Sequence, residues 1–395
     1  MNYNNLLSKK IFDKFSFNFW LIICVVISLA VTCQLYFGGT KTYAGDSHLY
    51  TEYNNYVIFK TSFFNLLHHQ NLYVLYPNDQ WDLYKYSPTF AFLFGVFAVL
   101  PNFIGLFFWN FLNSFFLFYA VNKVDSFSNR AKNFILIFNV IELFTSIQNA
   151  QSNALIAGLI LLAFTLAKAE KLFLSTLCIV LTVYIKLFGG IAFVMYLFFP
   201  NKLKTCVYSL FWTLCLALMP LIIVSPTQLF QQYENWLVLL KADKDASLGY
   251  SIFGWLKTWF NFLVSKNMLL CLGLAINLLP LLITKYFRHV NFQLLFVSSI
   301  LIWVVIFNHK AESPTFIIAT LGVALWYAIS QKTVFDKVLL VLVIVFTILS
   351  PTDIFPKSIN AAFVIPFVLK GVACIFVWLK VIYDLFCFND KSYLV

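Results

Sequence analysis

Charged residues are scarce in this chain of 395 residues, because Asp, Glu, Lys and Arg make up only 11% of it. Roughly a quarter of a water-soluble domain is charged, so this scarcity excludes an ordinary soluble protein. The long apolar runs also lack the polar–apolar alternation of membrane β-barrel strands. The chain is instead 61% hydrophobic, with runs such as Phe17–Phe37 and Thr205–Val224. Each run has about the 20 residues that an α-helix needs to cross a bilayer, so the sequence predicts an all-α polytopic membrane protein.

Metal and disulfide patterns are missing as well. The eight cysteines lie in or beside apolar runs, so no disulfide framework is expected. His48, His68 and His69 lack a third ligand, and we expect neither a metal site nor a cofactor. No internal repeat of the kind found in many transporters is visible. Much of the net charge of +11 flanks apolar runs, where anionic lipid headgroups attract it, so no nucleic-acid partner is implied.

The basic residues orient the chain. Lys9, Lys10 and Lys14 precede the first apolar run, which places the N-terminus in the cytoplasm by the positive-inside rule. No small-residue cleavage site follows Phe17–Phe37, so this helix is expected to be retained. With the remaining runs it predicts about twelve spans, one integral membrane domain over residues 1–395 and two cytoplasmic termini. The further spans are expected near residues 103–121, 134–147, 153–167, 172–185, 187–199, 205–224, 266–284, 291–307, 314–330, 334–350 and 362–386.

The apolar segment Pro88–Leu100 is too short to span a bilayer. We interpret it as a juxtamembrane or re-entrant helix on the outer side, with Ser87 as its N-cap and Pro88 as its first helical residue. The alternative is an ordinary spanning helix. That alternative would place the basic loop with Lys123 and Arg130 outside, against the charge rule.

Residues 172–199 also allow two interpretations. We expect two spans, with a break at Gly189–Gly190 or just before it, although one long tilted helix is the alternative. A single helix would place Lys202 and Lys204 outside. With two spans, the basic pairs of the short connections all face the cytoplasm, namely those at 168/171, 202/204, 285/288 and 332/337.

This orientation gathers the remaining polar residues at the extracytoplasmic face. The first outer loop covers residues 38–102, with juxtamembrane helices, and the second covers residues 225–265. The first loop carries Asp46 and His48, followed by an amphipathic stretch that suits a helix lying in the membrane interface. Glu142 stands inside a span, where a carboxylate is costly and is usually functional or paired.

The short outer connections add further candidate residues. Gln151 and Asn153 open one span, and Lys186 stands at the outer end of a hairpin. Ser313 and Pro314 are expected to be the N-cap and first residue of a helix, whose N-terminus would attract an anion. The candidate residues beside it are His309, Lys310 and Glu312. Lys186, His309 and Lys310 together predict a cradle for a phosphate at the membrane surface.

The order of these motifs resembles a known family. The chain has Asp46-Ser-His-Leu-Tyr50 after the first helix, then Asn71-Leu-Tyr73 and Tyr86-Ser-Pro88, and Ser313-Pro314 is the last of these motifs. Gln151-Ser-Asn153, Lys186 and Trp236 lie between them in order. Over residues 40–330 this layout is similar to the polyprenyl-phosphate-mannose-dependent mannosyltransferases of glycosyltransferase family 87, within the GT-C superfamily. The second loop departs from the family, with Gly249-Tyr250-Ser251 where an Asn-Gln-Ser stretch is common.

The resemblance implies a GT-C-like fold and a metal-independent, inverting transfer of a hexose, here mannose. The donor would be a polyprenyl-phosphate sugar in the membrane, and the acceptor a lipid or a glycan. Asp46 would be the catalytic base. Lys186, His309 and Lys310 would bind the donor phosphate. The sugar or acceptor pocket would comprise His48, Tyr86, Glu142, Gln151, Asn153 and Glu312.

Two other functions fit a polytopic chain of this kind. A flippase or transporter of lipid-linked saccharides would carry charged residues through the middle of the membrane, where this chain has mainly Glu142. A glycan polymerase or ligase would also work outside, with a large basic loop later in the chain. The early Asp46 and the amphipathic stretch that follows it favour the transferase.

Overall fold

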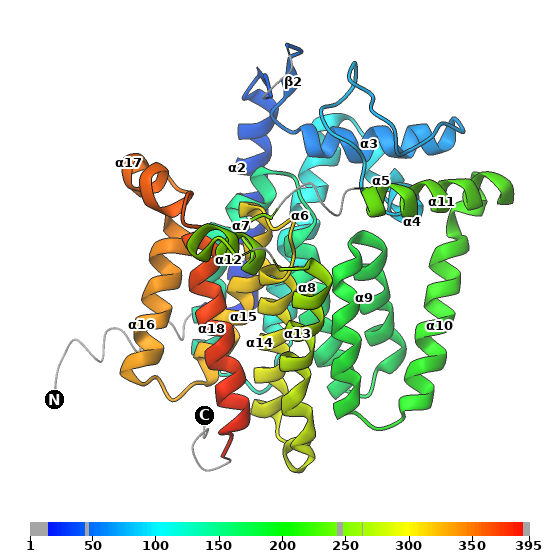
Figure 1. Ribbon diagram of the computed structural model, residues 1–395. Helices are drawn as coiled ribbons and strands as arrows, with labels where there is room; N and C mark the ends of the chain where they lie inside the picture. Colours follow the sequence, from blue (N-terminus) through cyan, green and yellow to red (C-terminus); the bar gives the residue numbers. More distant parts are fainter. Residues whose placement is uncertain (1–14, 44–46, 243–247, 263, 390–395) are drawn as a thin grey trace.

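The computed structural model describes residues 15–43, 47–242, 248–262 and 264–389. It is 74% helical, which agrees with the predicted all-α class. Within the described ranges, strands occur in one short antiparallel pair, β1 (Thr40–Lys41) and β2 (Tyr50–Thr51). Most of the helices run side by side as a bundle, and several others lie across one end of it (Figure 1).

The bundle and its crossing helices alternate along the chain. The bundle comprises α2 (Phe17–Phe37), α6 (Asn102–Asn122), α7 (Asn129–Gln148), α8 (Asn153–Lys168), α9 (Leu172–Ile185), η1 (Leu187–Phe198), α10 (Lys202–Leu218), α13 (Lys266–Leu278), α14 (Val290–Ile306), α15 (Phe316–Ile329), α16 (Val334–Leu342), η7 (Val343–Leu349) and α18 (Leu369–Phe386). The remaining helices are α3 (Asn54–Leu67), α4 (Pro88–Leu93), α5 (Gly95–Ala98), η2 (Met219–Ile222), α11 (Pro226–Ala242), α12 (Ile252–Phe260), η4 (Leu279–Leu282), η5 (Thr284–Tyr286), η6 (Ser313–Thr315), α17 (Lys357–Ile359) and η8 (Asn360–Val364). We call the end that carries α3, α11 and α12 the loop end.

Three helices of the described chain are long and apolar enough to cross a membrane: Phe17–Phe37, Asn102–Asn122 and Lys202–Ile222. A fourth candidate is the pair Lys357–Val364 and Leu369–Phe386, which is bent by 63°. Seven further apolar helices have only 10–17 residues. The apolar helices are compatible with a membrane protein, but the expected count of twelve spans is not confirmed.

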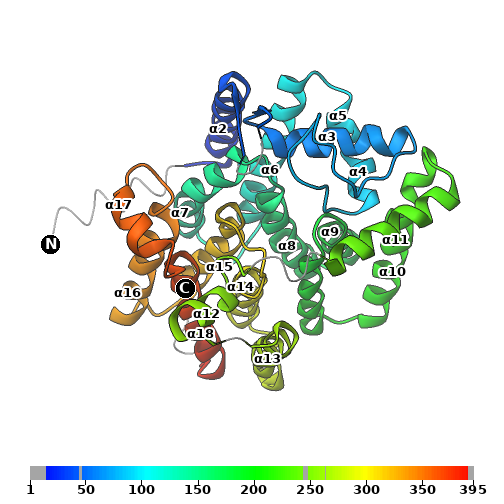
Figure 2. The same ribbon diagram turned by 45° about the horizontal axis from the view of Figure 1, so that its top comes forward.

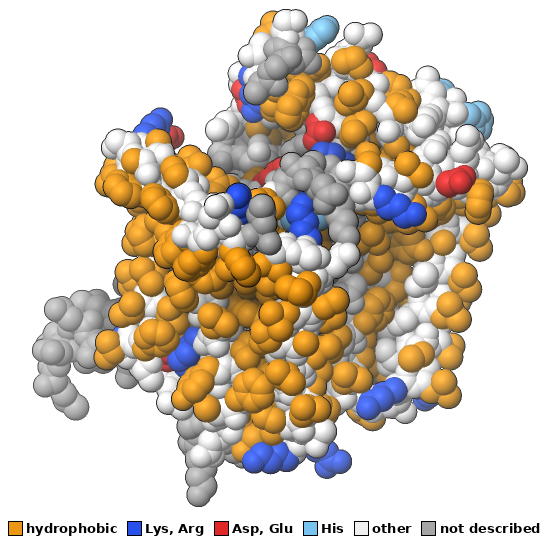
Figure 3. All heavy atoms as spheres, viewed as in Figure 1, with side chains coloured by type: hydrophobic (Ala, Val, Ile, Leu, Met, Phe, Trp, Pro, Cys, Tyr) orange, Lys and Arg blue, Asp and Glu red, His pale blue; other side chains and the backbone are white. Residues whose placement is uncertain are grey.

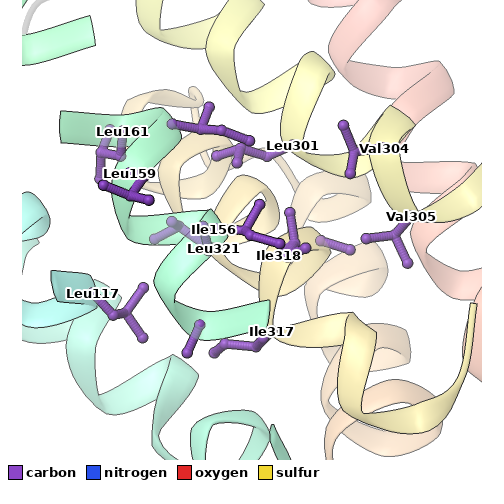
Figure 4. Close-up of a cluster of buried hydrophobic side chains, with 14 of the residues drawn as sticks. Leu117, Ile156, Leu159, Leu161, Leu301, Val304, Val305, Ile317, Ile318 and Leu321 are labelled. Carbon is purple, nitrogen blue, oxygen red and sulfur yellow. The ribbon is translucent and has the colours of Figure 1, made fainter. Parts of the chain in front are cut away.

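The centre of the molecule is formed by α14 and α15, which are buried on almost every side. Figure 4 shows Leu301 and Val305 of α14 facing Ile317 and Ile318 of α15, with α8 beside them. A helix that is apolar all round belongs in an interior of this kind. Because both helices are buried, α14 and α15 fix the position of the loop that connects them at the loop end.

Two predictions about helix ends are confirmed. Ser87 caps α4, because its hydroxyl accepts the Phe90 N–H, and Pro88 is the first helical residue. The Ser87 hydroxyl also lies 2.5 Å from the Tyr184 carbonyl oxygen, to which it donates, so that α4 is fixed to the end of α9. Residues 172–199 break in two at Lys186, which has an extended backbone between α9 and η1.

The predicted N-cap at Ser313 is wrong. The N-cap is Glu312, whose backbone is extended, and Ser313 already belongs to the 3₁₀ turn η6 that leads into α15. Reciprocal bonds fix this start, since the Thr315 N–H donates to the Glu312 carbonyl oxygen at 3.0 Å and the Glu312 N–H donates to the Thr315 hydroxyl at 3.4 Å. A carboxylate therefore stands where a free helix N-terminus was expected.

Helix α11 is attached to the segment that follows α3 (Figure 2). The Gln232 side chain accepts the Leu72 N–H at 3.1 Å and donates to the Gln70 carbonyl oxygen at 2.8 Å. These two bonds join the two predicted outer loops into one layer across the loop end.

Candidate active site

A cavity of about 500 Å³ opens at the loop end of the bundle. Its walls come from α3, the segment 81–86, the connection between α7 and α8, the junction of α9 with η1, α11, and the loop that leads into η6. In Figure 3 the middle of the molecule is mostly hydrophobic, and basic side chains stand towards both ends. The lining of the cavity, at one end of this apolar bundle, mixes charged and amide side chains with apolar and aromatic ones. The cavity is lined by six predicted site residues: Tyr86, Gln151, Lys186, His309, Lys310 and Glu312.

Lys186 is a partly buried cation of this cavity. Its backbone turns out of α9, and its ammonium donates to the Asn153 side-chain oxygen at 2.9 Å. The Tyr86 and Phe188 rings lie 5.6 Å and 5.8 Å from the ammonium. Burial lowers the pKa of the Lys186 ammonium to about 8, against the opposing attraction of Glu312. An anion in the cavity would offset this loss of solvation.

Asn153 stands behind the cavity wall and is fully buried. Its amide donates to the Gln151 side-chain oxygen at 2.6 Å and to the Pro314 carbonyl oxygen at 3.0 Å. The Gln151 amide in turn lies 3.2 Å from a carboxylate oxygen of Glu312. These contacts connect the start of α8 with the end of α9 and with η6.

His309 and Lys310 enter the cavity from the loop between α14 and η6. The Lys310 N–H donates to the Asn308 side-chain oxygen at 2.9 Å. The Ala311 carbonyl oxygen accepts the Tyr250 N–H at 2.9 Å, so the loop is also held by the segment before α12. Lys186 and these two residues therefore border one cavity, as the predicted phosphate cradle requires.

Aromatic and acidic residues line another part of the cavity. The Tyr43 and Trp81 rings are stacked, with centroids 4.3 Å apart and an interplanar angle of 9°. Two carboxylates there are paired with lysines, Glu52 with Lys41 at 2.7 Å and Asp82 with Lys85 at 2.9 Å. These residues were not predicted as site candidates from the sequence. Their signal was the clustering of aromatic and acidic residues in the first polar loop.

Besides Asn153, two of the predicted site residues that the structure describes, His48 and Glu142, do not line the cavity. Asp46 lies outside the described residues. His48 is exposed, with its ring 6.3 Å from that of Tyr50. Glu142 is buried within the bundle, where its carboxylate lies 2.8 Å from the Lys370 ammonium. Lys370 was not predicted from the sequence, where it is one of two lysines, with Lys380, inside the last long apolar stretch.

Metal ligation finds little support in the described ranges, where no group of three or more His, Cys, Asp or Glu residues could hold a metal ion. The cavity offers instead cations, amides, carboxylates and aromatic rings. Cations can stabilise a developing negative charge, and a carboxylate can accept a proton. Such an arrangement suits group transfer that involves an anionic group.

The helical fold and its apolar helices are compatible with a membrane protein, and the candidate site is a cavity at one end of the helix bundle. The model of glycosyltransferase family 87 matches residues 84–351, which is more than half of the chain, and the chain therefore belongs to this family. A comparison with curated proteins finds no match. Membership makes the protein a glycosyltransferase, which uses a sugar donor and an acceptor. It confirms the resemblance seen in the sequence.

Proposed function

We propose that this protein transfers a hexose, mannose, from a polyprenyl-phosphate donor to a lipid or glycan acceptor at the extracytoplasmic face of the membrane. The observation that carries the proposal is the meeting of Lys186, His309 and Lys310 in one large cavity. Family membership supports the transfer of a sugar. The apolar bundle below the cavity suits a donor whose lipid chain stays in the membrane.

The donor phosphate needs a cationic environment. When the bond between the sugar and the phosphate breaks, the departing polyprenyl phosphate gains negative charge. Cations positioned where this charge develops lower the barrier of the step. Lys186, His309 and Lys310 are assigned to this task, with Tyr86 beside them. The partly buried ammonium of Lys186 suits the task best, because little water screens it.

Asp46 is assigned as the base. An aspartate has a reference pKa near 3.9, so it is ionised at neutral pH and can accept the proton of the acceptor hydroxyl. The acceptor oxygen forms a bond to the anomeric carbon while the bond to the phosphate breaks, which inverts that carbon. Tyr43, three residues before Asp46, lines the cavity and supports this assignment.

The extracytoplasmic side is assigned from charge. Helix α8 begins at Asn153 beside the cavity and ends at Lys168, and α10 begins at Lys202 before it returns towards α11. Basic connections thus lie at the end of the bundle opposite the cavity. By the positive-inside rule that end faces the cytoplasm, which puts the cavity on the outer side.

The test of this function is the variant Asp46→Asn, with Asp79→Asn in the same loop as the matched control, because exposed Asp79 does not line the cavity. Purified protein is incubated with polyprenyl-phosphate mannose and candidate acceptors, and free polyprenyl phosphate is measured. We expect Asp46→Asn to lose at least a hundredfold in turnover while it still binds the donor, since a positioned base contributes roughly 10²–10⁴-fold. Turnover near that of the Asp79→Asn control would remove Asp46 from the mechanism.

A further inference from the structure

Four side chains in and behind the cavity form a continuous hydrogen-bonded chain. The Lys186 ammonium donates to the Asn153 oxygen at 2.9 Å, and the Asn153 amide donates to the Gln151 oxygen at 2.6 Å. The Gln151 amide then donates to the Glu312 carboxylate at 3.2 Å. The chain begins at a cation and ends at an anion, and every hydrogen bond in it points the same way.

This direction fixes both amide groups. A lysine ammonium can only donate and an ionised carboxylate can only accept, so neither amide can reverse without breaking two bonds of the chain. The Asn153 amide also donates to the Pro314 carbonyl oxygen at 3.0 Å, which leaves little freedom for this buried side chain. Hydrogen bonds in such chains polarise one another in a low-dielectric interior. The position and charge of the ammonium therefore depend on residues that it does not touch.

We propose that Asn153 and Gln151 are positioning residues, which hold the Lys186 ammonium at the donor phosphate and link it to Glu312. The sequence alone had predicted that both residues line the sugar or acceptor pocket. In this proposal they act through Lys186 instead. The placement of Asn153 supports this role, because Asn153 does not line the cavity and its side-chain oxygen accepts a hydrogen bond from Lys186. The inference rests on the proposed function in one respect, namely that the anion held by Lys186 is the donor phosphate.

The test follows the titration of Lys186 without any substrate. The full-length protein in detergent is acetylated briefly at a series of pH values, and the extent of reaction at Lys186 is read by mass spectrometry. In Asn153→Asp a carboxylate faces the ammonium, so we expect the midpoint pH of Lys186 acetylation to rise by about one pH unit or more. In Asn153→Leu the ammonium loses its acceptor and the midpoint falls. Gln151→Leu, at a less buried position, provides a second variant if Asn153→Leu does not fold.

The matched control is Asn149→Asp, which adds the same charge at a residue that lines the cavity but does not belong to the hydrogen-bonded chain from Lys186 to Glu312. Its shift should be less than half of that in Asn153→Asp. We also expect Asn153→Asp to raise the KM for the donor several-fold with a smaller change in kcat, because the added carboxylate offsets the cation. An unchanged Lys186 midpoint in folded Asn153→Asp overturns the inference. The midpoint is measured without donor, so a shifted midpoint in a protein that transfers no sugar would refute only the proposed function.

Discussion

At the scale of single residues, the site depends on a lysine with an unusual environment. Lys186 was predicted as a phosphate ligand from its place at the end of a hairpin, and the structure places it in the wall of the cavity. Its pairing with Asn153 was not predictable, because a sequence does not show whether an amide faces a substrate or a neighbouring lysine. The role of Asp46 stays a prediction, since that residue lies outside the described ranges.

The lowered pKa of Lys186 predicts a pH dependence. The protonated form holds the phosphate, and the pKa of about 8 means that this form is lost as the pH rises through 8. An unperturbed lysine would keep its charge to above pH 10. We therefore expect kcat/KM for the donor to fall tenfold for each pH unit above about 8. Steady-state rates between pH 6 and 10 test this expectation.

The control for this pH profile is Lys186→Arg. A guanidinium stays charged throughout that range, so the decline assigned to Lys186 should disappear even if the rate itself is lower. An identical decline in Lys186→Arg would show that another group titrates there.

At the scale of the elements, local signals predicted helix ends well where one residue dominates. Ser87 followed by Pro88 starts α4 as expected, because a capping hydroxyl and a ring-locked backbone act within one turn. The start of η6 was misplaced by one residue, since Glu312 and Thr315 bond to each other and take the capping role from Ser313. The partner of Glu142 lies 228 residues further along the chain, a distance that no local pattern spans.

The buried ion pair between Glu142 of α7 and Lys370 of α18 predicts a coupled effect on stability. The two side chains are 0% and 3% exposed, and Lys370 lies beyond the residues that match the family model. Lys370→Met leaves the Glu142 charge without its partner, which should cost roughly 3–5 kcal/mol. The double variant Glu142→Gln/Lys370→Met should recover most of that loss. Unfolding in detergent measures both effects.

Lys357→Met is the matched control for the ion pair, because its side chain is 85% exposed and its ion pair with Asp353 lies at the surface. A pair of this kind contributes at most about 1 kcal/mol, so this variant should stay close to the wild type. If the losses of Glu142→Gln and Lys370→Met simply add in the double variant, the two residues do not stabilise one another.

At the scale of the whole molecule, the helical class and the family predicted from the sequence are confirmed, whereas the predicted count of about twelve spans is not. Hydropathy marks apolar runs, whereas helices of 10–17 residues fall short of the roughly 20 that cross a bilayer without tilt or thinning. The helix η1 shows that the number of residues alone does not give the length that a helix spans. Its 12 residues form a 3₁₀ helix, which rises about 2 Å per residue and so reaches further than an α-helix of the same length.

The orientation of the bundle predicts which residues face the outside. Single cysteines at Asn78 and Gln231, both exposed at the loop end, should react with a membrane-impermeant maleimide in intact cells. Cysteines at Glu170 and Lys285, at the opposite end, should react only after the membrane is permeabilised. The eight native cysteines are first replaced by serine, and activity shows that the background remains folded. The reverse labelling pattern would place the cavity in the cytoplasm.

The central claim is that this cavity passes a sugar from a lipid phosphate to an acceptor without a metal. The most direct measurement is the release of free polyprenyl phosphate by purified protein supplied with polyprenyl-phosphate mannose and an acceptor in the presence of EDTA. We expect release under these conditions and none when GDP-mannose replaces the lipid donor. Release that stops with EDTA and returns with Mg²⁺ or Mn²⁺, or transfer from GDP-mannose alone, would contradict the account.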